Sequence, residues 1–239
     1  AISQIDKLTM QYEPITDIDL MERAATALFN RFVVSGVFGK IIFFCGPGNN
    51  GGDGLALARL LCSLPDMFQP FVYLFDFGHS LSPSAKINLE RLKALNKVQV
   101  ETPQNIDELF VEKNAIIVDA LFGAGLNRPL EGFAAEVVKY MNDSGNQIIA
   151  IDIPSGLLGE DNRNNVSNSI VKAHCTYTFQ FPKISFLFPE NSIYVGCWQL
   201  LDIGLHQLAI EQTPSYFHYI DYTDCSKIFK QREKFSHKG

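Results

Sequence analysis

Residues 40–58, KIIFFCGPGNNGGDGLALA, decide the fold of this chain. The apolar run Ile41–Cys45 is typical of a strand that is buried on both faces. It gives way to a glycine-rich segment, residues 46–54, and apolar residues then recur at helical spacing from Leu55. A strand, a glycine loop and a helix start bring backbone N–H groups close to a ligand, because glycine has no Cβ to hold the ligand away. We therefore expect residues 46–54 to form the floor of a binding pocket.

This glycine segment differs from an ordinary phosphate-binding loop. Residues 46–51 satisfy the G-x-G-x-x-G pattern of dinucleotide-binding proteins. However, Gly52-Asp53 stands where a Walker A loop has Lys-Ser/Thr, and a carboxylate at the helix start would repel a pyrophosphate. Asn49, Asn50 and Asp53 also add side chains that can hydrogen-bond a ligand. The segment therefore favours hydroxyl and amide groups as ligands, with a cation nearby.

Short apolar runs alternate with helical patterns along the rest of the chain. This alternation predicts an α/β fold that is Rossmann-like: a doubly wound, mostly parallel sheet with helices on both faces, in three layers (α/β/α). Asp17 or Asp19 is expected to cap the second helix, and Ser82 a later one. Further strands are expected at residues 71–75, 98–100, 115–120, 147–153, 176–179 and 193–203, and helices within residues 1–35, 82–95, 105–112 and 131–141.

Composition restricts the class of protein. The chain has 239 residues, of which 46% are hydrophobic and 19% charged, enough for one large domain with a buried core. The net charge is −6 and the basic residues are scattered, so nucleic acid is not an expected partner. No apolar run approaches the length of a membrane span or a secretion signal, so we expect no membrane partner and a cytoplasmic location. The five cysteines are widely spaced without C-x-x-C, which favours reduced thiols and argues against zinc.

Polar residues follow several of the predicted strands directly. Asp119, Asp152 with Ser155, and Lys183 come after three strands, and the loop at residues 123–129 follows Asp119 closely. In an open α/β sheet, ligands bind beyond the carboxyl ends of the strands, so these residues are expected to share one edge. An aspartate at a strand end is by itself commonly a turn or cap residue, and Lys183 fits a solvated turn equally well. The combination with the glycine segment is what points to a site.

The segment GPGNNGGDGLALARLL resembles the signature of the NAD(P)H-hydrate epimerase family, the YjeF N-terminal domain, and DLMERAATAL resembles that family's N-terminal helix. The resemblance extends over roughly residues 1–205. It implies an isomerase of metabolite repair that interconverts the R and S forms of hydrated NADH and NADPH, so that a dehydratase acting on one form can repair both. We accordingly expect this domain at residues 1–210. Residues 211–239 would be a linker and the start of a truncated C-terminal dehydratase domain, whose opening resembles FSHKG.

The resemblance also implies roles for single residues and a homodimer. Asn50, Asp119 and Ser155 match the family's potassium ligands, and their oxygen donors suit a hard alkali cation. Asp152 is expected to be the acid/base that moves a proton at the hydrated ring. After Pro182-Lys183 the family often has Gly and Leu where this chain has Ile-Ser-Phe, which leaves the direction of Lys183 open. The expected substrate contacts are Asn49, Asn50, Gly51, Gly52, Asp53, Gly123, Ala124, Gly125, Leu126, Asn127, Arg128, Pro129, Asp152 and Lys183.

Two other functions stay open at this point. A Rossmann dehydrogenase would use an acidic residue such as Asp76 to bind the ribose of intact NAD(P), but Asp53 and the lack of a second substrate domain argue against it. A catalytically silent YjeF-like domain that binds nucleotides or protein partners would not need Asn50, Asp119, Asp152 and Ser155 at the same time. A serine hydrolase is disfavoured, because Ser155 stands in I-P-S-G-L and not in G-x-S-x-G.

Overall fold

The computed structural model describes residues 2–220 and residue 225, and within them seven strands form one fully parallel sheet. The strand order is β3-β2-β1-β4-β5-β6-β7, which is the doubly wound order with β1 and β4 at its centre. The predicted fold class is confirmed. The strands are β1 Gly39–Cys45, β2 Phe68–Leu74, β3 Val100–Glu101, β4 Ile116–Ala120, β5 Gln147–Ile151, β6 Cys175–Phe179 and β7 Cys197–Leu201.

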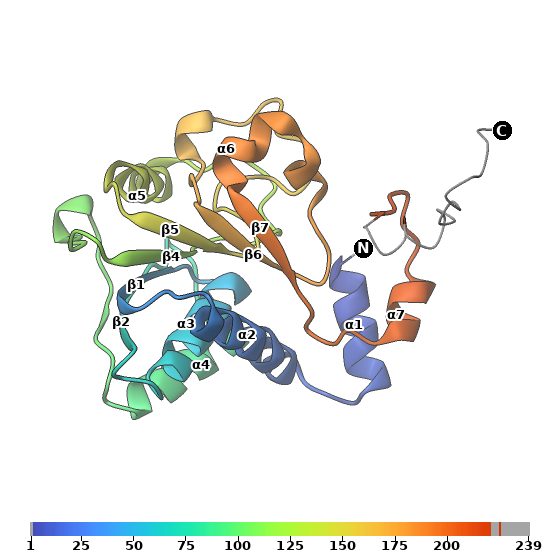
Figure 1. The fold of residues 1–239 in the computed structure, drawn as a ribbon, viewed down its shortest axis with the longest axis horizontal. Coiled ribbons are helices and arrows are strands. Elements are labelled where there is room, and N and C mark those ends of the chain that lie inside the picture. Colours follow the sequence, from blue (N-terminus) through green and yellow to red (C-terminus); the bar gives the residue numbers. More distant parts are fainter. Residues whose placement is uncertain (1, 221–224, 226–239) are drawn as a thin grey trace, which may run out of the picture.

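Helices cover both faces of this sheet, as Figure 1 shows. Helices α2, α3 and α4 lie on one face, and α5 and the short α6 lie on the other. The three layers of the prediction are therefore present. The helices are α1 Ile2–Tyr12, α2 Asp17–Val34, α3 Asn49–Leu61, α4 Pro83–Ala94, α5 Gly132–Asp143, α6 Ser192–Val195 and α7 Gln207–Gln212.

Each face of the sheet has its own hydrophobic core, because successive side chains of a strand point to opposite faces. Phe43 on β1 belongs to the core beneath α2–α4, whereas the next residue, Phe44, belongs to the core beneath α5. Both phenylalanines are fully buried. The continuous apolar run of β1 is thus explained by helices on both sides of a central parallel strand.

Helix α3 begins at Asn49, so the expected loop at residues 46–54 is wrong in its extent: most of it is the first turn and a half of the helix. Close packing explains why this helix tolerates glycines, which normally weaken helices. A Cβ at Gly51 would lie 1.8 Å from the carbonyl oxygen of Gly46, and a Cβ at Gly54 would lie 2.6 Å from the Cβ of Ala120. The glycines therefore let α3 sit directly against the ends of β1 and β4.

Three smaller expectations also differ from the structure. The cap of α2 is Thr16 in an extended conformation, and Asp19 accepts a hydrogen bond from the Thr16 N–H at 2.9 Å; neither Asp17 nor Asp19 is the cap itself. The helix expected at residues 105–112 is one 3-10 turn, Ile106–Glu108. The strand expected at residues 193–203 is split into α6 and β7 by Gly196, where φ is 60°. The expected cap Ser82 is confirmed, because its hydroxyl accepts from the Ala85 N–H.

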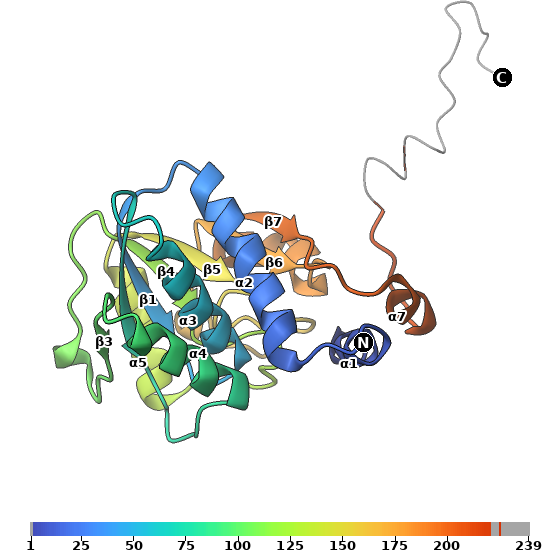
Figure 2. The same cartoon turned by 90° about the horizontal axis from the view of Figure 1, so that it is seen from below.

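Helices α1 and α7 lie side by side beyond the last strands, as Figure 2 shows. The rings of Tyr12 and His206 are 5.0 Å apart, and the His206 N–H donates to the Thr9 hydroxyl at 3.1 Å. Ile5 on α1 packs in a small hydrophobic cluster with Leu205. This contact holds the N-terminal helix next to the chain that leaves β7.

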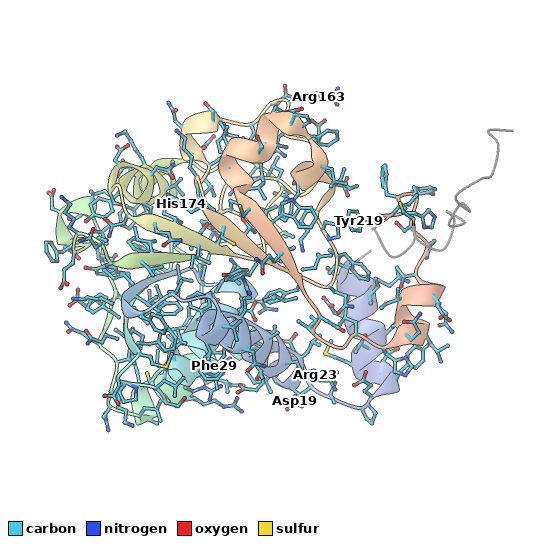
Figure 3. All side chains as sticks on the ribbon, in the orientation of Figure 1. Asp19, Arg23, Phe29, Arg163, His174 and Tyr219 are labelled. Atoms are coloured by element: carbon cyan, nitrogen blue, oxygen red, sulfur yellow. The ribbon has the colours of Figure 1, made fainter. Side chains whose placement is uncertain are left out.

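The remaining observations concern the surface of the molecule and the C-terminal part of the chain. Arg163, labelled in Figure 3 at the outer edge of the molecule, pairs with Asp161 in the polar segment after β5. No described helix is long and apolar enough to cross a membrane. The domain boundary at residue 210 falls within α7 and stays a prediction. Most of the expected linker and dehydratase start, residues 221–224 and 226–239, lies outside the described residues.

Candidate active site

A cleft of about 580 Å³ opens at the carboxyl ends of the strands, where the sheet order reverses between β1 and β4. These two strand ends are joined by a hydrogen bond of 2.9 Å from the Gly46 N–H to the Ala120 carbonyl. The lining comes from α1, α2, the start of α3 and the segments that follow β4, β5, β6 and β7. It comprises Ile2, Ser3, Asp6, Asp17, Leu20, Met21, Ala24, Pro47, Gly48, Asn49, Asn50, Asp53, Leu121, Phe122, Gly123, Ala124, Gly125, Leu126, Asp152, Phe179, Gln180, Lys183, Ile203 and Leu205.

The structure brings most of the predicted contact residues to this cleft. Asn49, Asn50 and Asp53 line it from α3, residues 123–126 line it after β4, and Asp152 and Lys183 line it after β5 and β6. Gly51 and Gly52 do not line the cleft, because they are buried inside α3. Residues 127–129 also lie outside its lining. The ribose-binding candidate Asp76 is not in the lining either; it accepts a hydrogen bond from Gly78 in its own turn.

Lys183 reaches the site and forms an ion pair with Asp152. Its Nζ lies 2.6 Å from Asp152 Oδ1 and 2.9 Å from Thr178 Oγ1. The Lys183 side chain is 3% exposed and that of Asp152 15% exposed, so the pair is largely withdrawn from water. Asp152 also accepts a hydrogen bond from the Ala124 N–H at 3.3 Å, and its φ of 66° lies in the left-handed region. Lys183 is therefore a buried residue of the cleft, and not the solvated turn lysine that the sequence left possible.

Asp119 and Ser155 form a buried hydrogen-bonded cluster beneath the cleft. The Ser155 hydroxyl donates to Asp119 Oδ1 at 2.6 Å, and the Ser155 N–H donates to Oδ2 at 2.7 Å. The Phe122 N–H donates to the same hydroxyl at 2.9 Å, which ties the segment after β4 to the segment after β5. Burial raises the pKa of Asp119 to about 6, although the hydrogen bonds from Ser155 oppose this shift.

Asn50 lies at the floor of the cleft with an unsatisfied amide. Both its Oδ1 and its Nδ2 are buried and have no hydrogen-bond partner among the described residues. Gly123 packs against it, because a Cβ at Gly123 would lie 3.3 Å from the Asn50 Cβ. A buried polar group without a hydrogen-bond partner destabilises the folded state by roughly 1–3 kcal/mol. The presence of two such atoms on Asn50 therefore points to a ligand at this position.

The cleft is rich in carboxyl groups. Burial, and then the charges of Asp152, Asp17 and Asp6, raise the pKa of Asp53 well above its usual range. Among the described residues that line the cleft, Lys183 is the only basic one, and it is paired with Asp152. Asp53 therefore holds its proton more tightly than an ordinary aspartate, and in its protonated form it can donate a hydrogen bond to a bound ligand.

Asp6 makes the stability of the protein depend on pH. Burial raises the pKa of Asp6 from 3.8 to about 6, the charges of Asp152 and Asp17 add to this, and Lys183 opposes it. The folded state keeps a proton that the unfolded state releases, so this stabilisation is complete below about pH 4 and is lost as the pH rises through 6.

Asp6→Asn is expected to stabilise the protein by about 1–2 kcal/mol at about pH 7.5, allowing for partial solvent screening, and to change its stability little at about pH 4. Thermal unfolding at both pH values tests this, with the exposed Asp66→Asn as control; equal shifts at both would contradict it.

Several lining residues were missed by the sequence analysis. Asp6 and Asp17 belong to the N-terminal helices α1 and α2, and nothing local in the sequence links them to the strand ends. Gln180 had a weak signal, since it is the residue directly after β6 and polar residues that follow a strand lie at the edge where ligands bind.

The fold and the cleft define a Rossmann-like α/β domain with a cleft at the switch point of its sheet, the place where such folds bind ligands. Residues 17–185 match the family model described as YjeF-related protein N-terminus. The chain belongs to this family.

Relatives of two lengths share this domain. The chain is 34% identical to the NAD(P)H-hydrate epimerase of Oenococcus oeni, with 79% of this chain and 86% of that protein covered. It is 32% identical to the bifunctional NAD(P)H-hydrate repair enzyme Nnr of Dictyoglomus turgidum, with 98% of this chain and 45% of that protein covered. The chain thus spans about half the length of such bifunctional relatives. The crystal structure of yeast ynu0, YNL200c, superposes with a TM-score of 0.63 at 25% identity, covering 80% of this chain and 82% of that one.

Proposed function

We propose that this chain epimerises hydrated NADH and NADPH, interconverting their R and S forms as a step of metabolite repair. Family membership and the names of its relatives support this function. The structural observation that carries it is the Asp152–Lys183 ion pair, which faces the same cleft as Asn49, Asn50 and Asp53. A proton-transfer group and a set of ligand-binding groups are thereby present in one cavity.

The reaction needs proton transfer and no redox partner. C6 of the hydrated nicotinamide ring carries a hydroxyl and is bonded to the ring nitrogen. If the hydroxyl leaves as water, the nitrogen lone pair stabilises the cation at C6, and water returning to the other face inverts the centre and gives back the proton. Ring opening at the same carbon followed by reclosure reaches the same product. Both routes require a group that delivers a proton to an oxygen or nitrogen on C6 and takes it up again.

Asp152 performs this proton exchange in our proposal. Its carboxylate takes the proton of the C6 hydroxyl as the ring opens and delivers it to the departing ring nitrogen, and the proton moves back when the ring closes on the other face of the aldehyde. The Lys183 ammonium, 2.6 Å away, holds the carboxylate in position. Asp53, which lines the same cleft, hydrogen-bonds a substrate hydroxyl and fixes its position.

A potassium ion is the cofactor that fits the floor of the site. The unpartnered Asn50 Oδ1 is one oxygen donor. Asp119 Oδ2 accepts one hydrogen bond and keeps a lone pair, and the Ser155 hydroxyl oxygen is a further donor. A bound alkali ion would hold the segments after β1, β4 and β5 in place, which is a positioning role.

Potassium should therefore stabilise the protein through Asn50. At a potassium concentration ten times its Kd, binding contributes about 1.4 kcal/mol, or a rise in Tm of about 3–6 °C. Titration of potassium chloride against tetramethylammonium chloride at constant ionic strength, followed by thermal unfolding, measures this shift. Asn50→Leu should abolish the shift without lowering the Tm in tetramethylammonium, because it removes an unsatisfied buried amide. A potassium response that survives in Asn50→Leu would place the ion elsewhere.

The direct test of the function is equilibration of purified R-NADH hydrate. Chromatography should show R and S forms reaching their equilibrium ratio faster with the protein than without it. A folded protein that binds the nucleotide but does not accelerate equilibration would support the second candidate, a catalytically silent nucleotide-binding or protein-interaction domain.

Further partners remain part of this proposal. The bifunctional relatives support a dehydratase domain following residues 211–239 of this chain, which would consume one of the two epimers. A homodimer and a cytoplasmic location stay predictions from the sequence.

A further inference from the structure

Gln180 is held in a strained backbone conformation on the wall of the cleft. Among the lining residues, only Asp152 and Gln180 are non-glycine residues with positive φ, at 66° and 55°. Aspartate adopts the left-handed region fairly readily, whereas glutamine does so rarely because its Cβ meets the following carbonyl oxygen. Glycine would fit this position without strain, and strained residues tend to cluster at functional sites. We therefore expect the side chain of Gln180 to have a role that glycine could not fill.

Two hydrogen bonds to the chain around β7 determine which way the Gln180 amide points. The Gln180 N–H donates to the Leu201 carbonyl at 2.8 Å, and its Oε1 accepts from the Ile203 N–H at 3.2 Å. Because an N–H donor engages the oxygen, the other end of the amide is the NH₂ group. Within the described part of the chain this NH₂ group donates to no other residue, although Gln180 lines the cleft and is only half-buried.

The cleft has few positively charged groups for an oxygen-rich ligand. Its ionisable lining is dominated by Asp6, Asp17, Asp53 and Asp152, and two of the three ammonium protons of Lys183 go to Asp152 and Thr178. A nicotinamide nucleotide presents acceptor oxygens on its carboxamide, ribose and phosphate groups. A neutral, oriented amide donor matches such an acceptor without adding charge.

We propose that the Gln180 NH₂ group donates a hydrogen bond to an oxygen of the hydrated nicotinamide nucleotide and determines specificity for it. This inference rests on the proposed function for the identity of the ligand. In this proposal the strained backbone at residue 180 serves to place the amide at the cleft that Asp152 and Lys183 also line.

Two substitutions distinguish the effect of losing the NH₂ donor from the effect of relieving the backbone strain at residue 180. Gln180→Gly removes both, so the Kd for NADH hydrate should rise about 3–10-fold while the Tm rises by about 2–4 °C. Gln180→Glu keeps the size of the side chain and the oxygen that accepts from Ile203, but loses the donor. Its Kd should rise at least as much, with no gain in Tm. Asn96→Gly, at an exposed position with φ of 51°, is the control that relieves strain outside the cleft and should leave the Kd unchanged.

Isothermal titration calorimetry with NADH hydrate and with ADP-ribose gives the Kd values, independently of activity. Weaker binding of NADH hydrate alone places the acceptor on the nicotinamide half, and equal weakening of ADP-ribose places it on the other half; both support the donor role. If both Gln180 variants bind both compounds within twofold of the wild type, the proposal is overturned. The wild-type equilibration assay is run alongside, so failure of the epimerase function is seen separately.

Discussion

Asp152→Asn is expected to slow epimerisation of NADH hydrate by about 10²–10⁴-fold, the usual contribution of a positioned acid/base. Asparagine has nearly the same size, tolerates the φ of 66° at this position, and can still accept from the Ala124 N–H. It cannot take up a proton at neutral pH. The substitution therefore removes the proposed chemistry while preserving the shape of the cleft. Chromatographic separation of the R and S forms over time measures the rate.

The controls address stability, because the substitution leaves Lys183 without its partner at 3% side-chain exposure. Loss of one member of a buried ion pair costs about 3 kcal/mol. Replacing both members, Asp152→Asn with Lys183→Met, should recover most of the lost Tm and still leave epimerisation slow. Asp161→Asn, which removes an exposed carboxylate paired with Arg163, should keep the wild-type rate. A folded Asp152→Asn protein within threefold of the wild-type rate would show that another group moves the proton.

Gly51→Ala is expected to destabilise the protein by about 3 kcal/mol or more, or to prevent folding. Helix propensity alone predicts the opposite sign, since alanine inside a helix is favoured over glycine by about 0.5–1 kcal/mol. The new Cβ would lie 1.8 Å from the carbonyl oxygen of Gly46, a backbone atom at the end of β1 that cannot move aside locally. Steric overlap therefore outweighs propensity, and the start of α3 would be pushed away from the sheet.

Gly48→Ala is the matched control, three residues earlier in the same segment. A Cβ at Gly48 meets nothing within 4 Å, so the change should stay within about 1 kcal/mol. Urea or thermal unfolding of the two variants compares them directly. Comparable stability of Gly51→Ala and Gly48→Ala would mean that close packing of α3 does not explain the glycines.

The strands and the fold class were predictable because buried parallel strands carry an unusually clear pattern. Residues 115–120 and 147–153 are short apolar runs between helical patterns, and β4 and β5 lie within them. Residues 193–203 look similar in hydrophobicity but contain Gly196, where a Cβ would lie 2.4 Å from the Ala173 carbonyl oxygen. That close approach ends α6 and starts β7, and hydrophobicity alone does not encode it.

The candidate site was predictable where its residues follow strands directly. Ser155 after β5 hydrogen-bonds Asp119 of β4, and Asp152 after β5 hydrogen-bonds Ala124 after β4, because the carboxyl ends of parallel strands share one edge. Lys183 was undecided from the sequence, because its aim depends on the 3-10 turn at residues 184–187 and on Thr178. Asp6 was missed, since it reaches the cleft only through the packing of α1 against α7.

By itself, the sequence determined the doubly wound fold, the edge at which a ligand binds and the family to which the chain belongs. These properties depend on local hydrophobic periodicity, on glycines and on short motifs, all of which are readable within about 20 residues. Only the tertiary structure decided that α3 begins at Asn49, that Lys183 pairs with Asp152, and that Asp6 and Gln180 line the cleft. Those features are set by contacts between segments far apart in the chain, where packing and burial override local preference.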